Sequence, residues 1–119
     1  MSQFSYTEFE KRPWGSYFVI HDEKNYKVKR IEVHRGKRLS YQYHEKRSEA
    51  WTIVQGAALV TLDGKDIKLL HGQSIKIPQG SKHRIENIGK TDLIFIEIQT
   101  GSYFGEDDIV RIEDDYKRV

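Results

Sequence analysis

The chain is 119 residues long, 37% hydrophobic and 32% charged, and it contains no cysteine. This length suits one domain with a thin core, and the lack of cysteine excludes disulfides and thiolate ligation of a metal. The net charge of +2 gives no electrostatic reason to expect a nucleic-acid partner.

The N-terminal segment, residues 1–15, has no apolar run and carries acidic residues early, so we expect no signal peptide. No stretch of the chain approaches the length of a membrane span, so we expect no membrane partner. A cytoplasmic location is expected, because it also fits the lack of cysteine.

Apolar and polar residues alternate with a period of two along the chain, and no long segment has the helical period. Gln55-Gly56 is expected to form a tight hairpin turn, and Asp63-Gly64 a type I′ turn. Many short strands with glycine-containing turns predict an all-β fold, either a double-sheet jelly roll or a barrel. The expected strands are 16–20, 26–33, 39–43, 51–54, 58–62, 66–70, 74–77, 84–86 and 93–99.

The C-terminal segment, residues 101–119, differs in being acidic and aromatic. We expect it to lie over the barrel, with Ile109 and Ile112 as packing residues and one helical turn after Glu106-Asp107. The single domain, residues 1–119, is therefore divided into an N-terminal arm (1–15), a barrel (16–100) and a C-terminal tail (101–119).

Four polar residues have the spacing of a metal site inside a small β-barrel. Gln42 and His44 are two residues apart, so on a strand they point to the same side. Glu49 follows after a short turn, and the bend at 78–80 would turn His83 toward the other three. In the alternative interpretation, Gln42 is a surface glutamine and the two histidines satisfy backbone groups in a polar cavity. The joint spacing favours the metal site.

This donor set contains no sulfur and suits a divalent metal ion. Zn²⁺, Mn²⁺, Fe²⁺, Co²⁺ and Ni²⁺ are all compatible with two imidazoles, one carboxylate and one amide oxygen.

The two segments that carry these residues resemble those of the cupin superfamily. The chain as a whole resembles one branch closely, the type II mannose-6-phosphate isomerase domain, which usually forms the C-terminal part of a bifunctional phosphomannose isomerase/GDP-mannose pyrophosphorylase. The resemblance implies a cupin jelly-roll barrel (a double-stranded β-helix), a sugar phosphate as the small-molecule partner, and metal-dependent interconversion of mannose 6-phosphate and fructose 6-phosphate. It rests on residues 12–17 (RPWGSY), 26–31, 39–42, 47–49, 96–99 and 105–111 (GEDDIVR).

Three features depart from that branch. Its His-rich run is replaced by Glu45, Lys46 and Ala50, and we interpret the missing histidines as groups behind the ligands. Its closing Tyr-Gly-Arg reads Tyr116-Lys117-Arg118. The nucleotidyltransferase domain has no counterpart, so we expect a domain on its own that does not make GDP-mannose.

An isomerase of this kind must move a proton between neighbouring carbons. Glu97 is the catalytic candidate, because Phe95, Glu97 and Gln99 share one face of a strand and suggest a polar interior. An outward, solvated Glu97 is an equal alternative.

The phosphate of the substrate requires cations near the mouth of the barrel. Arg47 and Arg84 flank the metal ligands and are candidates for substrate binding, with Lys29 as a further one. Arg111 is assigned to the catalytic site, because it matches the closing block of the resembled branch and a tail folded over the mouth could carry it in. A surface salt bridge is an equally good interpretation for each.

Two other functions fit the same residues. One is a non-catalytic module that keeps the metal and binds a sugar or sugar phosphate, and the other is a different cupin metalloenzyme such as an Fe²⁺ oxygenase. A homodimer is also expected, in which aromatic residues of the N-terminal arm cover a sheet edge. Alternatively, these residues pack on their own barrel; they are Phe4, Tyr6, Phe9 and Trp14.

Overall fold

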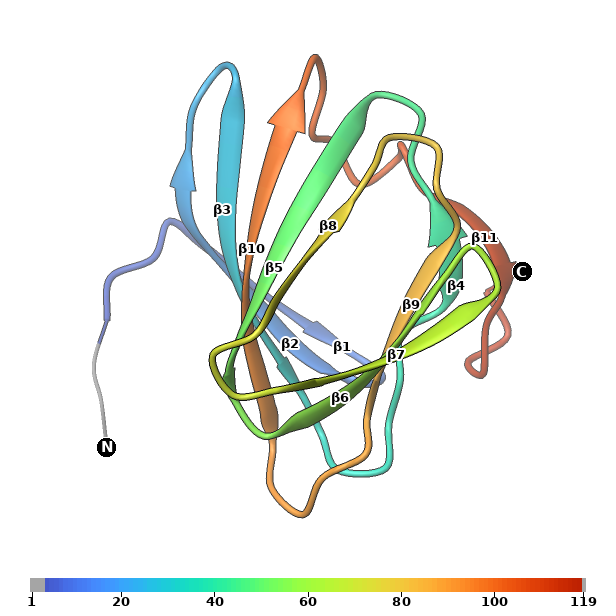
Figure 1. Cartoon of the computed structure of the whole chain (residues 1–119). Coiled ribbons are helices and arrows are strands. Elements are labelled where there is room, and N and C mark those ends of the chain that lie inside the picture. The colour runs from blue at the N-terminus through green and yellow to red at the C-terminus, as the bar shows by residue number, and fades with distance from the viewer. Residues whose placement is uncertain (1–3, 119) are drawn as a thin grey trace.

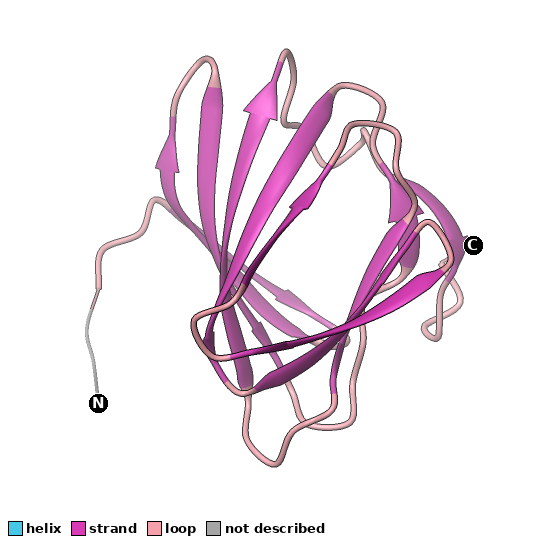
Figure 2. Ribbon diagram, in the orientation of Figure 1, coloured by secondary structure: helices cyan, strands magenta, loops and turns pink. Residues whose placement is uncertain are grey.

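The computed structural model describes residues 4–118, which form strands and loops and no helix (Figure 2). Two antiparallel sheets enclose the core, as Figure 1 shows. The six-stranded sheet contains, in spatial order, β1 (Glu8–Arg12), β2 (Gly15–Asp22), β3 (Tyr26–Val33), β10 (Leu93–Gly101), β5 (Arg47–Gln55) and β8 (Ser74–Ile77). The five-stranded sheet contains β11 (Val110–Glu113), β4 (Tyr41–Tyr43), β9 (His83–Asn87), β6 (Ala57–Leu62) and β7 (Lys65–Leu70).

The expected all-β class is therefore confirmed. Within residues 4–118, no helix is long and apolar enough to cross a membrane.

The interior changes from apolar at one end to polar at the other. Each strand turns alternate residues inward, and along β10 these are first Leu93 and Phe95, then Glu97 and Gln99, all at most 5% exposed. The antiparallel neighbour β5 matches this change, because Ile53 lies opposite Phe95 in the register. The apolar end stabilises the fold by burying aliphatic and aromatic side chains, each worth about 1.5–3 kcal/mol. The polar end forms the candidate site.

The N-terminal arm is part of the sandwich rather than an appendage to the barrel. Its residues 8–12 form β1, which pairs with β2 along its whole length. Trp14 lies in the core, whereas Phe4, Tyr6 and Phe9 pack around Phe18 of β2. Charged residues dominate the sequence of β1, and this concealed the strand from an argument based on apolar alternation.

The hairpin expected at Gln55-Gly56 is not formed. Strands β5 and β6 belong to different sheets, so the chain crosses from one sheet to the other at Gly56. Gly56 has a φ of 94°, and a Cβ there would lie 3.3 Å from backbone atoms of Asp92 and Leu93. A glycine between two strands allows a sharp change of direction, but only the tertiary fold decides whether those strands pair.

The turn at Asp63-Gly64 agrees with the sequence. Asp63 and Gly64 have φ values of 48° and 81°, as a type I′ turn requires, and β6 pairs with β7 across them.

The tail contains a turn and a strand instead of the expected helical turn. The amide of Asp108 donates to the carbonyl of Gly105 at 3.1 Å, and the chain then enters β11, which pairs with β4. Ile109 lines the cavity, but Ile112 is exposed, contrary to the packing role expected for it.

Lys117 adopts a left-handed conformation, with a φ of 61°. The resembled branch has glycine at this position. A side chain in this conformation costs roughly 1–2 kcal/mol, whereas glycine adopts it freely. Lys117 therefore holds a backbone conformation that a glycine would adopt without this cost.

Candidate metal centre

Three of the expected ligands meet at the polar end of the interior. His44 lies in the loop after β4, Glu49 on β5 and His83 at the start of β9, so the two sheets both contribute. One donor atom from each lies within 4.8 Å of the others, and all three residues are buried. The cluster is thus assembled from segments far apart in the sequence.

Backbone carbonyls fix the orientation of both imidazoles. His44 Nδ1 lies 2.8 Å from the carbonyl oxygen of Asp108, and His83 Nδ1 lies 2.9 Å from that of Ser81. Each Nδ1–H therefore donates to a carbonyl, and each Nε2 faces Glu49, at 3.2 Å for His44 and 3.9 Å for His83. This arrangement is typical of histidine ligands, whose second nitrogen is held by an outer hydrogen bond.

Gln42 lies on the wall of the same cavity. It is directly opposite His83 in the pairing of β4 with β9, so both side chains face inward. The structure thus brings all four expected ligands to one cavity.

Glu49 is held as a carboxylate. It accepts hydrogen bonds from Arg47 Nε and Trp51 Nε1, both at 3.0 Å. Burial alone would raise the pKa of Glu49, but the hydrogen bond from His44, the charges of His83 and His44 when these are protonated, and the charge of Arg47 hold this pKa well below its usual range.

His83 is held in the neutral form that a metal ligand requires. Burial lowers the pKa of His83, and the opposing effect of Glu49 does not restore it. A neutral imidazole, a second imidazole with its Nε2 turned inward and an ionised carboxylate fit a divalent ion of the zinc, manganese, iron, cobalt or nickel type. The residues could hold such an ion, and the donor set leaves its identity open.

Glu97 faces the cavity, so the alternative interpretation, in which its side chain points outward into solvent, is wrong. Its Oε1 accepts from Trp51 Nε1 at 3.2 Å and its Oε2 from Gln99 Nε2 at 2.7 Å. Burial, followed by the negative charge of Glu49, raises the pKa of Glu97 to about 8. Trp51 therefore connects two carboxyl groups whose pKa values are shifted in opposite directions, an arrangement typical of acid–base sites.

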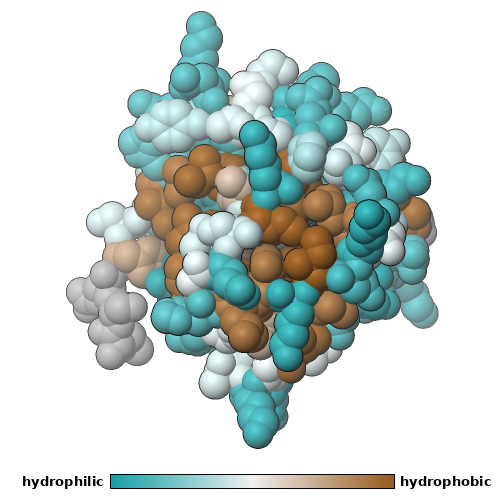
Figure 3. All heavy atoms as spheres, in the orientation of Figure 1, coloured by the Kyte–Doolittle hydropathy of each residue, from teal (hydrophilic) through white to brown (hydrophobic). Residues whose placement is uncertain are grey.

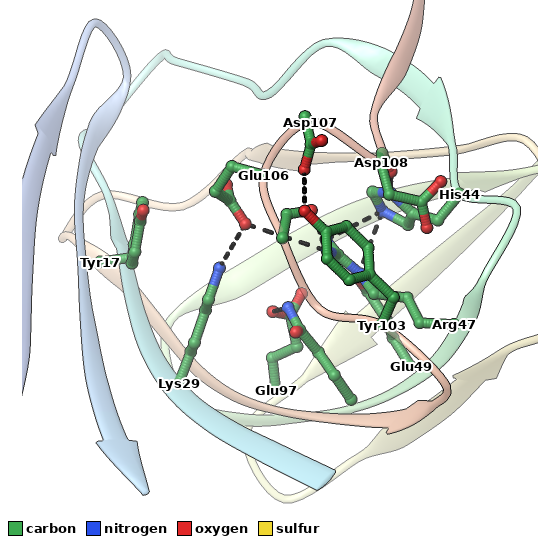
Figure 4. Close-up of polar contacts among 12 residues, drawn as sticks. Tyr17, Lys29, His44, Arg47, Glu49, Glu97, Tyr103, Glu106, Asp107 and Asp108 are labelled. Atoms are coloured by element: carbon green, nitrogen blue, oxygen red, sulfur yellow. Dashed lines mark hydrogen bonds and ion pairs between the residues drawn. The ribbon is translucent and has the colours of Figure 1, made fainter. Parts of the chain in front are cut away.

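Two expected cations reach the cavity from the six-stranded sheet. Arg47 lies two residues before Glu49 on the same strand face, and Lys29 extends inward from β3. Figure 4 shows Lys29 pointing to Glu106, with which it forms an ion pair at 2.9 Å, and Glu97 lying below them. Arg111 of β11 also lines the cavity.

Arg84 does not reach the cavity. It follows His83 directly on β9, so its side chain leaves the opposite face of the sheet. Its guanidinium donates to the carbonyls of Leu39 and Glu113 and borders a separate hollow on the outer side. The assignment of Arg84 to substrate binding is therefore wrong for this structure.

A strap formed by residues 102–109 covers the site, as expected for a tail that lies over the barrel, but its contacts with His44 and its loop were not evident from the sequence. The Asp108 carboxylate accepts from the backbone amides of Glu45 and Lys46, at 3.0 and 2.9 Å. Figure 4 shows Glu106, Asp107 and Asp108 on this segment, above the side chains of Glu97 and Glu49.

Sequence reasoning also missed Trp51. The signal was available, because Trp51 lies two residues after Glu49 and so shares its strand face. The acidic strap gives no such local signal.

The positions of the missing histidines lie outside the cavity. Glu45, Lys46 and Ala50 are exposed, and Lys46 lies over the ring of Tyr103. The interpretation that these positions stand behind the ligands is wrong, since the groups behind the ligands are backbone carbonyls, Arg47 and Trp51. Their replacement removes nothing from the metal cluster.

Known proteins resemble this chain in sequence and in fold. Residues 3–114 match the family described as "Mannose-6-phosphate isomerase C-terminal". The chain belongs to this family. It is 52% identical over 109 residues to a mannose-1-phosphate guanylyltransferase of Escherichia coli (strain K12), a match that covers 91% of this chain and 23% of that protein. It is 50% identical over 108 residues to the alginate biosynthesis protein AlgA of Pseudomonas aeruginosa, a match that covers 91% of this chain and 22% of AlgA.

The chain therefore spans less than a quarter of the length of these relatives. Their names describe whole proteins, of which the family region is the smaller part.

Solved structures confirm the cupin fold of this family member. CapF, a capsular polysaccharide assembling protein of Staphylococcus aureus, matches with a TM-score of 0.75 and 22% identity over 89% of this chain and 34% of CapF. KdgF from Halomonas sp. matches with a TM-score of 0.71 and 18% identity, over 79% of this chain and 88% of KdgF. The cupin domain of Schizosaccharomyces pombe Cnp3 matches with a TM-score of 0.69 and 15% identity, over 80% of this chain and 69% of that domain's chain. At these identities the likeness concerns the fold alone.

Proposed function

We propose that this chain is a metal-dependent isomerase that interconverts mannose 6-phosphate and fructose 6-phosphate. The observation that carries the proposal is that a His44–Glu49–His83 triad and the buried carboxyl of Glu97 face one cavity. Membership of the mannose-6-phosphate isomerase C-terminal family supports the choice of substrate.

The reaction moves a hydrogen between neighbouring carbons of the sugar. A divalent ion held by His44, Glu49, His83 and Gln42 would polarise the carbonyl oxygen and stabilise the negative charge of the enediolate. Glu97 accepts the proton from C2 of mannose 6-phosphate and returns it to C1, while a proton passes from O2 to O1. No atom is gained or lost.

The environment of Glu97 suits this task. Hydrogen bonds from Trp51 and Gln99 fix both of its oxygens. A pKa raised to about 8 lets the group accept and release a proton near neutral pH, where general acid–base catalysis is most efficient.

We infer that the strap moves when a sugar phosphate enters the cavity. The cavity has a volume of about 60 Å³, which holds only a few water molecules. Glu106, the strap residue that pairs with Lys29, keeps 34% of its side chain exposed. Its outward displacement would open the cavity and free the ammonium group of Lys29 for a substrate oxygen.

A coupled assay for fructose 6-phosphate tests the proposal. The protein is stripped of metal and then given Zn²⁺, Mn²⁺, Co²⁺, Fe²⁺ or Ni²⁺ in turn. We expect one or more of these ions to restore turnover, and His83→Ala and Gln42→Ala to abolish or strongly reduce it. His71→Ala, which removes an exposed histidine, is the matched control and keeps full activity.

Two results would contradict the isomerase function. Tight metal binding without turnover under any metal would leave a sugar-phosphate binding module. Oxygen consumption that depends on iron would assign the site to oxygenase chemistry instead.

A further inference from the structure

We propose that Arg111, together with Arg12 and Arg118, forms an anion subsite that binds the phosphate group of the substrate at the rim of the cavity. The identity of this anion as a sugar phosphate rests on the proposed function. The subsite itself rests on the charges and contacts of these side chains.

The cations around the cavity differ in whether a carboxylate already neutralises them. Lys29 pairs with Glu106, and Arg47 with Glu49. The other cations that line the cavity are Arg12, Arg111 and Arg118.

Arg12 pairs with Glu10, and Arg118 pairs with Asp114. Among the residues that the structure describes, Arg111 forms no ion pair within 4.0 Å, and its buried Nε has no hydrogen-bond partner. A buried N–H of a charged group without an acceptor is costly, because its lost hydration is not replaced. Arg111 is therefore the cavity cation that a bound anion would satisfy.

The neighbours of Arg111 add to this uncompensated charge. Burial lowers the pKa of Arg111, and the positive charges of Arg118 and Arg12 lower it further, against the opposing effect of Asp114. Three guanidinium groups thus act on one region of the cavity rim. An anion placed there relieves their mutual repulsion and accepts charge-assisted hydrogen bonds from the planar guanidinium groups.

The fold brings these groups together at the edges of its two sheets. Arg12 ends β1, the edge strand of the six-stranded sheet, and Arg111 lies on β11, the edge strand of the five-stranded sheet. Arg12 and Arg118 keep 27% and 26% of their side chains exposed, so an anion can approach from solvent.

The distance from the metal cluster suits a sugar with a phosphate on its far end. Arg111 lies opposite Gln42 in the pairing of β11 with β4, and Gln42 lies opposite His83 in the pairing of β4 with β9. Arg111 is thus two strands from His83 on the same inner face, roughly 10 Å at about 4.8 Å per strand spacing. One end of the substrate reaches the ligands while the phosphate stays at the rim.

Binding of inorganic phosphate to the metal-free protein tests the subsite separately from catalysis. Isothermal titration in a phosphate-free buffer is carried out on the original chain and on Arg111→Gln, Arg47→Gln and Arg35→Gln. Arg35 is the matched control, because it is an exposed arginine outside the cavity. We expect Arg111→Gln to weaken phosphate binding at least tenfold and Arg35→Gln to leave it within twofold. Unchanged metal binding by Arg111→Gln confirms that this variant is folded.

The outcomes separate this inference from the proposed function. Phosphate binding that depends on Arg111, in a protein without isomerase turnover, supports the subsite and rejects the isomerase. Isomerase turnover with an unchanged KM for mannose 6-phosphate in Arg111→Gln overturns the subsite and keeps the isomerase. Phosphate binding that is absent, or that is lost in Arg47→Gln and kept in Arg111→Gln, also overturns the subsite.

Discussion

Glu97 and Glu49 show how one cavity gives two carboxyl groups opposite properties. Both are buried, but Glu49 accepts from Arg47 and faces two histidines, whereas Glu97 accepts from the neutral groups of Trp51 and Gln99. The pKa of Glu49 therefore lies well below its usual range, and that of Glu97 rises to about 8.

We expect the metal-free protein to lose stability as the pH rises from about 6.5 to 8. In this interval the unfolded state has already released the proton of Glu97, while the folded state retains it, because its pKa is about 8. The free energy of unfolding then falls by up to about 1.4 kcal/mol per pH unit. Below pH 6.5 the lowered pKa of His83 has the opposite effect, since only the unfolded state binds that proton.

Urea unfolding at a series of pH values measures this dependence. Glu97→Gln keeps the shape of the side chain without a titrating group, so its stability should be nearly flat between pH 6.5 and 8. An equal slope in Glu97→Gln would assign the effect to another group.

The strap is the element that connects the tail to the metal cluster. The carbonyl of Asp108 accepts from His44, and its carboxylate accepts from two amides of the loop that carries His44. A single strap residue therefore fixes both the ring and its loop.

We expect Asp108→Ala to lower metal affinity, because the loss of the carboxylate releases the loop that carries His44 and so weakens the hold of the Asp108 carbonyl on the ring. The loss of an outer partner of a ligand typically costs about 10–100-fold in affinity. Asp107→Ala is the matched control, because Asp107 is an exposed acid of the same strap and, among the described residues, its side chain hydrogen-bonds to Tyr103 and not to the loop that carries His44. Metal titration compares the two variants. Equal losses would indicate that the negative charge of the strap, rather than its hydrogen bonds, supports the site.

The two-sheet sandwich leaves apolar side chains on its outer surface. Figure 3 shows such side chains gathered over the middle of the face turned to the viewer. Tyr6, Phe9, Val54, Leu70 and Ile98 each expose more than 40% of their surface. Exposed apolar groups of this size are typical of interfaces, although single ones are also common on monomers.

The homodimer expected from the sequence stays a prediction, and the structure narrows the residues that would form it. Trp14 lies in the core, so it is not available to a partner, whereas Phe9 and Tyr6 are. We expect light scattering after size exclusion to give a dimer that Phe9→Lys converts to a monomer. A monomeric original chain would show that these aromatic side chains serve only to cover β2.

The sequence by itself determined the all-β class of the fold, the spacing of the candidate ligands and the shared strand face of Phe95, Glu97 and Gln99. Each of these depends on local regularities: strand periodicity, the i, i+2 rule that pairs Gln42 with His44, and the turn preference of Asp63-Gly64. Sequence blocks at both ends of the chain resemble the mannose-6-phosphate isomerase branch of the cupins. The family match over residues 3–114 confirms this assignment.

Only the tertiary structure decided how strands pair and which side of a strand is inside. In the folded chain, Gly56 connects two strands of different sheets instead of forming a hairpin. The side chain of Arg84 points away from the cavity, and β1 and β11 lie at the edges of the two sheets. The tertiary structure also brought the strap over His44. These results depend on contacts between residues far apart in the chain, and no local pattern encodes them, because the energy of such contacts appears only when the sheets come together.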